Sequence, residues 1–428
     1  MFFSNKRYVR NVFKSTSILF LMILGSVVNA STLSNIQDAP EALQQFIKQI
    51  LPTHPRFIAA QAERDAALAS YSASDNAIYN PELELDIEKT NIRTSTIGLS
   101  QTIDWGDQQG AKTEIAKHIV DAAQAAFQKK RQKLIRDLLF FSRDFHNKLR
   151  LATLSNQRLK LMKDFSNVAR QKHNAGDINQ VELDLAQLAY SESVLKNAQV
   201  TTEKINAEQA YIALYGVEFK QGHDNLTNVT VDFDEVVLPS DLNKFIRSLP
   251  QMKIFRARVA ASKSTIGLRE SESSADPTIA IRSGKEDKES LVGVSVTIPL
   301  NVRNSYSAEV NVARKEYLQA EQLAQQAWRN LRRDITTQTR HYQLMRTAWL
   351  QWKQSGQVSI NRQMKLLKRL WQSGDLSTTE YLVQINQALD TQAAGIELQT
   401  TLWLSWLTWL ESTAQIESWL KINPLRNP

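Results

Sequence analysis

The sequence predicts a mainly helical fold with a small β part, in which two long helical hairpins are each joined to a pair of strands. Three observations predict it: the chain is duplicated, it holds long helical patterns almost without proline or glycine, and short segments alternate apolar and polar residues. The duplication is the most informative of the three, because it fixes how the elements are arranged along the chain.

One short phrase occurs twice, first as Gly-Asp-Ile-Asn-Gln-Val-Glu-Leu from Gly176 and again as Gly-Asp-Leu-Ser-Thr-Thr-Glu-Tyr from Gly374. Each copy supplies a glycine to end one helix, an N-cap (Asn179 or Ser377) and a glutamate in the first turn of the next helix. Each copy therefore predicts a tight turn between two long antiparallel helices. Three further matches keep the same order at a nearly constant offset: Leu51-Pro52 with Leu249-Pro250, Asn80-Pro81 with Asp276-Pro277, and Ile97 to Ile103 with Val292 to Ile298.

The repeat divides the chain into five parts. These are a signal peptide (1–30), a first structural repeat (31–216), a connecting or equatorial segment (217–242), a second structural repeat (243–421) and a C-terminal tail (422–428). Each repeat is expected to contain a helix, a β-hairpin (82–104 or 277–300) and a long helix pair with a tip turn (175–178 or 373–376). We expect the connecting segment to form an irregular belt around the helices.

The first thirty residues read as a secretory signal peptide that is cleaved after Ala30. Four basic side chains precede an apolar run from Ile18 to Val28, which is too short to span a membrane as an anchor, and small residues follow it. Removing this segment lowers the formal charge from +8 to +4, so the basic balance gives no reason to expect nucleic acid as a partner. The chain has no cysteine, which excludes disulfides and thiolate metal sites.

A helix from about Gln108 to Lys172 would span roughly 100 Å, more than an ordinary globular domain. After the second turn, apolar residues at steps of three and four predict a packing seam along the helix. This seam is Leu382, Ile385, Leu389, Ile396, Trp403, Trp406 and Leu410, and its counterpart in the first repeat begins Ile178, Val181, Leu185, Leu188 and Leu195. We interpret Trp403, Trp406, Trp409 and Trp419 as core rather than as a ligand stack.

The alternating segments predict a strand pair in each repeat. The first pair is Glu82 to Glu88 with Thr96 to Ile103, and the second is Thr278 to Arg282 with Leu291 to Ile298. We expect Asn91 and Arg93 in the first connection and residues 285–288 in the second. Strands of about nine to eleven residues suit a tilted crossing of an outer membrane, but four strands cannot close a barrel in lipid. If these strands span the membrane, several chains must share one barrel, and three chains of four strands would give twelve.

These features resemble the TolC-type outer membrane efflux proteins from about Leu51 to Trp419. Asn80-Pro81-Glu82-Leu83 and the stretch from Leu99 to Gly106 are similar to the CzcC-like branch, which serves heavy-metal exporters. The resemblance implies a homotrimer in the outer membrane of a Gram-negative bacterium, with a twelve-stranded β-barrel that continues into a long periplasmic α-barrel. It also implies a periplasmic adaptor (membrane fusion) protein and an inner-membrane RND pump as partners.

The same resemblance places the two turns at the periplasmic tip, where the adaptor docks and the channel closes. Glu182 and Glu380 match the family's acidic position after each tip glycine, so a trimer would bring six carboxylates to the constriction. Further tip candidates are Gly176, Asp177, Asp184, Gly374 and Asp375. The alternative for both glutamates is a structural role, because carboxylates are favoured at helix N-termini generally.

The first strand carries a second candidate site. Glu82, Glu84, Asp86 and Glu88 share one face, and Leu83, Leu85 and Ile87 share the other. If the apolar face meets lipid, the four acids line the lumen and favour cations. The alternative is a solvated strand face without a selective role, and Arg282, Lys285 and Lys288 are expected to offset part of the field.

No enzymatic motif accompanies these features. The sequence lacks a glycine-rich phosphate loop, a Gly-x-Ser-x-Gly elbow and a His-Glu-x-x-His pair, and its six histidines are scattered. We therefore expect no catalytic residues, no cofactor and no metal site. Within transport, drug efflux or type I protein secretion remains an alternative to metal export. An exported coiled-coil structural or interaction protein is the alternative of a different class.

Overall fold

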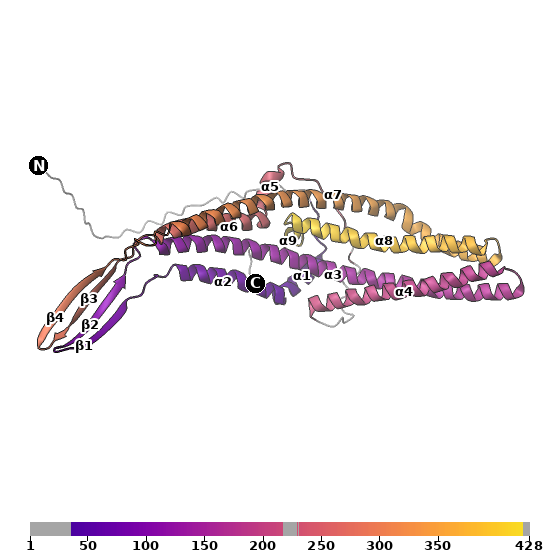
Figure 1. The fold of residues 1–428 in the computed structure, drawn as a ribbon. Helices are drawn as coiled ribbons and strands as arrows, with labels where there is room; N and C mark the ends of the chain where they lie inside the picture. Colours follow the sequence, from indigo (N-terminus) through magenta and orange to yellow (C-terminus); the bar gives the residue numbers. More distant parts are fainter. Residues whose placement is uncertain (1–35, 217–228, 230, 423–428) are drawn as a thin grey trace.

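The computed structural model describes residues 36–216, 229 and 231–422. The described chain is elongated, with a four-stranded sheet at one end and two helical hairpins that reach the other end (Figure 1). The signal peptide and its cleavage after Ala30 lie outside the described residues, as do residues 217–228 and 230 of the connecting segment and residues 423–428 of the tail. The predicted fold class, mainly helical with four strands, is confirmed.

The elements fall into two similar series along the chain. The first series is α1 (Glu41–Ile50), a 3-10 turn (Leu51–Thr53), α2 (Pro55–Ser74), β1 (Glu82–Lys89), β2 (Arg93–Thr102), α3 (Gln108–Ala175) and α4 (Gln180–Tyr215). The second series is α5 (Leu242–Ser248), α6 (Pro250–Ser271), β3 (Thr278–Glu286), β4 (Glu289–Thr297), α7 (Ser307–Ser373), α8 (Thr378–Ser412) and α9 (Ile416–Trp419).

The strands form one antiparallel sheet in the order β1-β2-β3-β4, so β1 and β4 are its two edges. Both connections at the far end of the sheet are shorter than the sequence predicts. Arg93 is the first residue of β2 rather than part of a loop, and Lys285 and Glu286 still belong to β3. A two-residue turn of Asp287 and Lys288 then joins β3 to β4, with Asp287 at a positive φ of 52° that suits a tight hairpin turn.

Two helices, α3 and α7, run from the sheet to the far end, each about 100 Å long from its residue count. Along α3, the shorter helices α2 and α4 pack one after the other, and α6 and α8 do the same elsewhere on its surface. The helix α7 packs against α6 and α8 (Figure 1). Across the width of the molecule, the helices therefore lie in four layers: α2 with α4, then α3, then α6 with α8, then α7. The pair α2 and α4 lies at one outer edge and α7 at the other.

The main core lies halfway along the helices, where α1, α9 and the connecting segment thicken the molecule. Trp403, Trp406, Trp409 and Trp419 are all buried in it, which confirms their interpretation as core. Trp406 and Trp409 stack with ring centroids 5.4 Å apart. The predicted seam of α8 is also confirmed, because all seven of its residues are buried.

The seam predicted for α4 is not buried within a single chain. Val181, Leu188 and Leu195 are exposed, the last at 73% of its surface. The side of α4 that packs against α3 instead carries smaller residues such as Ala186, together with Leu183. Val181, Leu188 and Leu195 thus form an apolar stripe that no part of the described chain covers.

The described part of the connecting segment crosses the middle of α7. Tyr342 Oη donates a hydrogen bond to the backbone oxygen of Asp234 at 2.6 Å, and Arg346 Nε donates to that of Phe233 at 2.6 Å. Val236 is fully buried. The segment therefore lies against the helices in an irregular conformation, as the sequence predicts, over its described residues.

Candidate functional site

The two turns at the helical end have the same backbone geometry. Gly176 and Gly374 both adopt φ 85°, in the left-handed region that glycine enters without a steric penalty. At the first turn the Asp177 N–H donates to the carbonyl of Lys172 at 2.9 Å, and at the second the Asp375 N–H donates to that of Leu370 at 2.9 Å. These bonds complete a Schellman motif at each helix end, so both turns are tightly fixed.

Each turn is followed by a capping box that uses the predicted glutamate. The Glu182 N–H donates to Asn179 Oδ1 at 3.0 Å, and the Asn179 N–H donates back to Glu182 Oε2 at 3.2 Å. Glu380 and Ser377 repeat the arrangement at 3.2 Å and 3.1 Å. The hydroxyl and the N–H of Ser377 donate to the Glu380 carboxylate and lower its pKa. Both carboxylates thus have a structural role as caps, and both remain at the surface of the turn.

The other tip acids hold positions around the same turns. Asp375 accepts a hydrogen bond from Ser373 Oγ at 2.6 Å, and Asp184 accepts one from Gln180 Nε2 at 2.7 Å. Asp177, Asp184 and Asp375 are all exposed. The structure therefore brings the predicted acids together as two small groups, one on each turn, at the same end of the molecule (Figure 1).

An aromatic cluster joins the two hairpins just behind the turns. The Phe165 ring of α3 lies 4.6 Å from that of Trp371 and 5.3 Å from that of Tyr381, and Lys172 Nζ lies 5.2 Å from the Trp371 ring centroid. Further along, Arg158 of α3 donates to Asp390 Oδ1 at 2.6 Å and to Asn386 Oδ1 at 2.9 Å on α8. Sequence reasoning missed these cross-hairpin contacts, because they join residues about 200 or more positions apart.

The sheet separates its side chains into an apolar and a polar face, as its alternation predicts. Antiparallel partners point to the same side, so the register places Leu85, Ile97 and Val292 on one face and Glu84, Gly98 and Arg282 on the other. The apolar face is open to solvent in the single chain, with Leu85 70% and Val294 69% exposed. All four acids of β1, namely Glu82, Glu84, Asp86 and Glu88, lie on the polar face.

Arg282 lies in the middle of this polar face, between Gly98 on β2 and Gly293 on β4. A Cβ atom on Gly293 would lie 3.1 Å from Arg282 Nε, and one on Gly98 would lie 3.3 Å from Arg282 Cβ and 3.5 Å from Glu84 Oε2. Gly293 therefore leaves room for the Arg282 side chain, whose outer atoms lie over β4, the strand farthest from the β1 acids. The expectation that Arg282 offsets part of the acidic field stays a prediction.

The expectation for Lys285 was wrong, and two acids of the polar face were missed. Lys285 pairs with Ser95, which shares the apolar face with Ile97, so it points away from the β1 acids. Glu286 pairs with Thr94 and with Glu289, which puts both glutamates on the polar face next to Glu88. Strand β3 continues two residues further than the sequence predicts, so Lys285 and Glu286 keep its alternation, and the two-residue turn then sets the side of Glu289.

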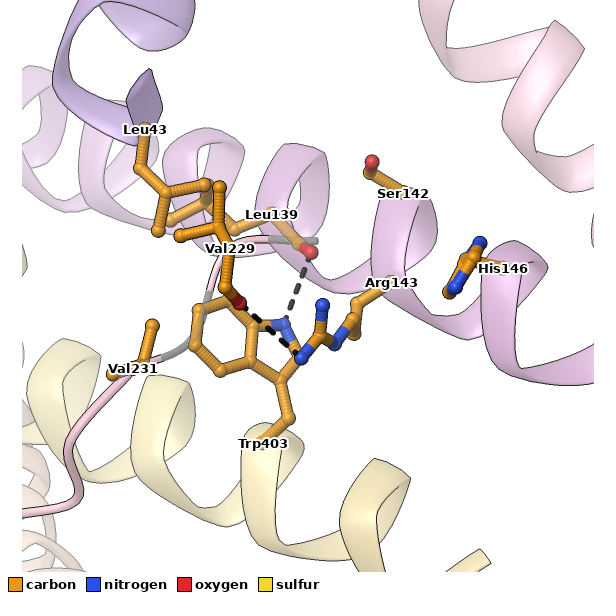
Figure 2. A pocket seen from close by; sticks show the side chains of 8 residues that line it. All are labelled: Leu43, Leu139, Ser142, Arg143, His146, Val229, Val231 and Trp403. Atoms are coloured by element: carbon orange, nitrogen blue, oxygen red, sulfur yellow. Dashed lines mark hydrogen bonds between the residues drawn. The ribbon is translucent and has the colours of Figure 1, made fainter. Parts of the chain in front are cut away.

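The cavity drawn in Figure 2 belongs to the core and not to the sites at the turns or on the sheet. The cavity in Figure 2 lies between α1, α3, α8 and the connecting segment and measures about 20 Å³, the space of roughly one water molecule. Trp403 Nε1 donates to the Leu139 carbonyl at 3.1 Å, and the Arg143 guanidinium lies 5.9 Å from the Trp403 ring centroid (Figure 2). This arrangement serves to pack the connecting segment.

Among the residues that the structure describes, no three histidine or acidic side chains are grouped so as to hold a metal ion. No helix in residues 36–216 or 231–422 combines the length and the apolar character needed to cross a membrane.

Part of the chain matches one family model, and its structure is similar to a set of solved channels. The family model for outer membrane efflux proteins matches residues 46–217. No curated protein sequence matches the chain. The open state of the MtrE outer membrane channel of Neisseria gonorrhoeae is similar at 13% identity and a TM-score of 0.72, covering 90% of this chain and 93% of that one.

Two further solved structures agree. The CmeC outer membrane channel of Campylobacter jejuni has 14% identity and a TM-score of 0.69, with 88% and 86% covered. The outer membrane protein VceC of Vibrio cholerae has 14% identity and a TM-score of 0.66, with 87% and 95% covered. At these identities the likeness establishes a shared fold.

Proposed function

We propose that this chain is the outer-membrane channel of a tripartite efflux system. Its match to the family model and its fold support a place among the outer membrane efflux proteins. One observation carries the proposal. A sheet with one apolar, solvent-exposed face continues directly into two helices of about 100 Å, an arrangement suited to joining a bilayer to a deep aqueous compartment.

The sheet supports a homotrimer because it is incomplete. Its edges β1 and β4 carry unpaired backbone groups, and such edges are not tolerated in lipid. Three chains, each pairing β4 with β1 of the next, would close a twelve-stranded barrel with all apolar faces outward. Its inner wall would carry the β1 acids together with Glu286 and Glu289.

The helices support the same closure. The exposed apolar stripe of α4, which includes Val181, Leu188 and Leu195, lies at one edge of the helical order, and α7 lies at the other. Leu344 and Leu366 of α7 are also exposed. Packing α4 of one chain against α7 of the next would cover both and form the periplasmic α-barrel.

The turns after α3 and α7 would then lie at the periplasmic end, where we place the contact with an adaptor protein and, through it, an inner-membrane RND pump. A trimer would bring six copies of the capping glutamate to this end. Because Glu182 and Glu380 already hold their turns together, their proposed role at the aperture has to be tested separately from their role as caps.

Glutamine separates the two roles, because it fills the N3 position of a capping box without carrying charge. In planar bilayers, the double variants Glu182→Gln/Glu380→Gln and Glu182→Ala/Glu380→Ala should both raise single-channel conductance and weaken block by divalent cations. If only the Ala variant changes the conductance, the carboxylates act as caps and not at the aperture. Unchanged conductance and block in both variants would remove these residues from the gate.

The cargo we propose is a heavy-metal cation. The acids on the inner face of the sheet would favour cations, and the sequence around Asn80-Pro81 and Leu99 to Gly106 resembles the metal-export branch. Deleting the gene should sensitise cells to Zn, Co or Cd ions more than to detergents or dyes. The reverse ranking would assign the channel to drug efflux, and loss of a secreted protein would assign it to type I secretion.

A further inference from the structure

At the hairpin end of the sheet, three cations point to the same side as the apolar residues. Lys89 is the last residue of β1 and pairs directly with Arg93, the first residue of β2. Lys285 of β3 pairs with Ser95, two positions beyond Arg93 on the same face. All three side chains are exposed, and within the part of the chain that the structure describes none of them forms an ion pair.

This grouping is unfavourable for an isolated sheet. Directly opposed side chains in an antiparallel pair lie about 5 Å apart and diagonal neighbours about 7–8 Å apart, and like charges at such positions destabilise the pairing. The acids of the same region do not relieve it, because Glu88, Glu286 and Glu289 lie on the opposite face. Asp287, in the turn, donates its N–H to the Arg93 carbonyl at 2.9 Å without forming an ion pair with Arg93.

The position of the cations along the sheet is also specific. From the helices outward, the apolar face runs through Leu83, Leu85 and Ile87 of β1 before it reaches Lys89. The change from apolar to basic therefore takes place over the last two rows of the sheet, a height of about 7–14 Å. A lipid bilayer changes from acyl chains to charged head groups over a similar distance.

We propose that Lys89, Arg93 and Lys285 bind the phosphate groups of lipid A in the outer leaflet around the barrel. This inference rests on the proposed function, because it requires the apolar face to meet the acyl chains and the hairpin ends to reach the outer surface. The Arg93 fork binds two phosphate oxygens at once, and the two lysines add point charges on long apolar stems. The lipid phosphates would thus supply negative charge to the apolar face, because the acids of the sheet lie on the opposite face.

The test compares lipopolysaccharide retained by purified trimers, measured as lipid A per chain by mass spectrometry after a wash at fixed ionic strength. The variant Lys89→Gln/Arg93→Gln/Lys285→Gln should retain on the order of tenfold less than the wild type, since each surface cation contributes substantially to binding anionic lipid. Arg282→Gln is the matched control, because it removes a cation from the inner face of the same strand as Lys285. It should retain the wild-type amount.

A charge-keeping variant, Lys89→Arg/Lys285→Arg, should also retain lipid A at the wild-type level and guards against a general effect of substitution. Equal retention by the triple variant and the wild type would overturn the inference. So would an equal loss in Arg282→Gln. If instead the wild-type protein neither inserts into bilayers nor conducts, the proposed function itself fails, which this design distinguishes from failure of the lipid site alone.

Discussion

Among single residues, Arg131 of α3 and Glu417 of α9 form a buried ion pair. Arg131 Nε donates to Glu417 Oε1 at 2.7 Å and its Nη2 donates to Oε2, while both side chains are over nine-tenths buried. The Arg131 guanidinium also lies 5.7 Å from the Phe127 ring centroid. The bidentate geometry satisfies both charges and fixes the C-terminal helix against the centre of α3.

Breaking this pair on one side should be costly. Glu417→Ala leaves the Arg131 charge buried without its partner, and we expect a loss of about 3–5 kcal/mol in the free energy of unfolding. Thermal and denaturant unfolding of the detergent-solubilised protein measure this. The double variant Arg131→Met/Glu417→Leu is the control and should recover most of the loss, because it removes both charges. A single variant as stable as the wild type would contradict the burial of the pair.

The Glu380 cap gives a prediction with a defined pH direction. Its folded-state pKa is lowered by the Ser377 hydrogen bonds, so the ionised cap stabilises the turn above the ordinary carboxyl range. That contribution is lost as pH falls below about 4.5 and through the lowered value. Hydrogen exchange at the Ser377 and Glu380 amides should therefore lose protection on acidification, after correction for intrinsic rates. In Glu380→Gln this dependence should disappear; if it persists, another group is responsible.

Among the elements, those that depend on near neighbours in sequence could be predicted. The turn glycines, the N-caps Asn179 and Ser377 and the α8 seam all follow from residues within one or two helical turns. Partner choice could not be predicted in the same way. Val181, Leu188 and Leu195 have the spacing of a packing seam, but spacing does not say whether the partner belongs to the same chain.

The candidate site was predictable to a similar extent. The acidic face of β1 follows from strict alternation, whereas the sides of Lys285 and Glu286 depend on where β3 ends, and the side of Glu289 depends on the length of the turn that follows. A shift of one residue there moves every following side chain to the other face. The contacts between hairpins, such as Arg158 with Asp390, depend on how two distant segments meet and leave no local pattern.

The pairing of α7 with α8 depends on two glycines, Gly356 and Gly395, which leave room for the indole ring of Trp352. A Cβ atom on Gly395 of α8 would lie 2.5 Å from two ring atoms of Trp352, and one on Gly356 of α7 would lie 2.1 Å from the same ring. The Trp352 side chain thus occupies the space that a larger residue at either position would need. Close approach of the two helices at this level requires both glycines.

Gly395→Ala should displace Trp352 and destabilise the α7 and α8 pair by about 1–3 kcal/mol, the usual cost of overpacking. Gly267→Ala in α6 is the matched control, because nothing lies within 4 Å of the added methyl group. It should be neutral or stabilise the helix by up to about 1 kcal/mol. Denaturant unfolding and tryptophan fluorescence measure both variants. Equal stability of the two would show that Trp352 adjusts without cost.

At the scale of the whole molecule, assembly should depend on which face of the sheet is changed. Ile97→Asp/Val294→Asp places two charges per chain on the apolar face and should prevent trimers from forming in the outer membrane, because charges facing lipid are strongly disfavoured. Thr96→Asp/Ser295→Asp changes the neighbouring residues of the same strands, which face the other side. This control should still assemble. Heat-resistant trimers in membrane fractions provide the readout.

The same measurement decides between the two classes of protein. A soluble periplasmic monomer for the wild-type chain would favour an exported coiled-coil protein, with an ordinary sheet at its end. Normal trimers from Ile97→Asp/Val294→Asp would refute the lipid-facing placement even if the protein is a channel. The two results are independent, so each can fail without the other.

The hairpins at the far end of the sheet are very short, with residues 90–92 joining β1 to β2 and residues 287–288 joining β3 to β4. If the sheet lies in the bilayer as we propose, almost none of the polypeptide projects beyond the cell surface. Bacteriophages and antibodies would then have little exposed polypeptide to bind on this protein. A surface tag inserted between Asp287 and Lys288 would have to reach beyond the membrane surface by its own length, because the turn adds almost none.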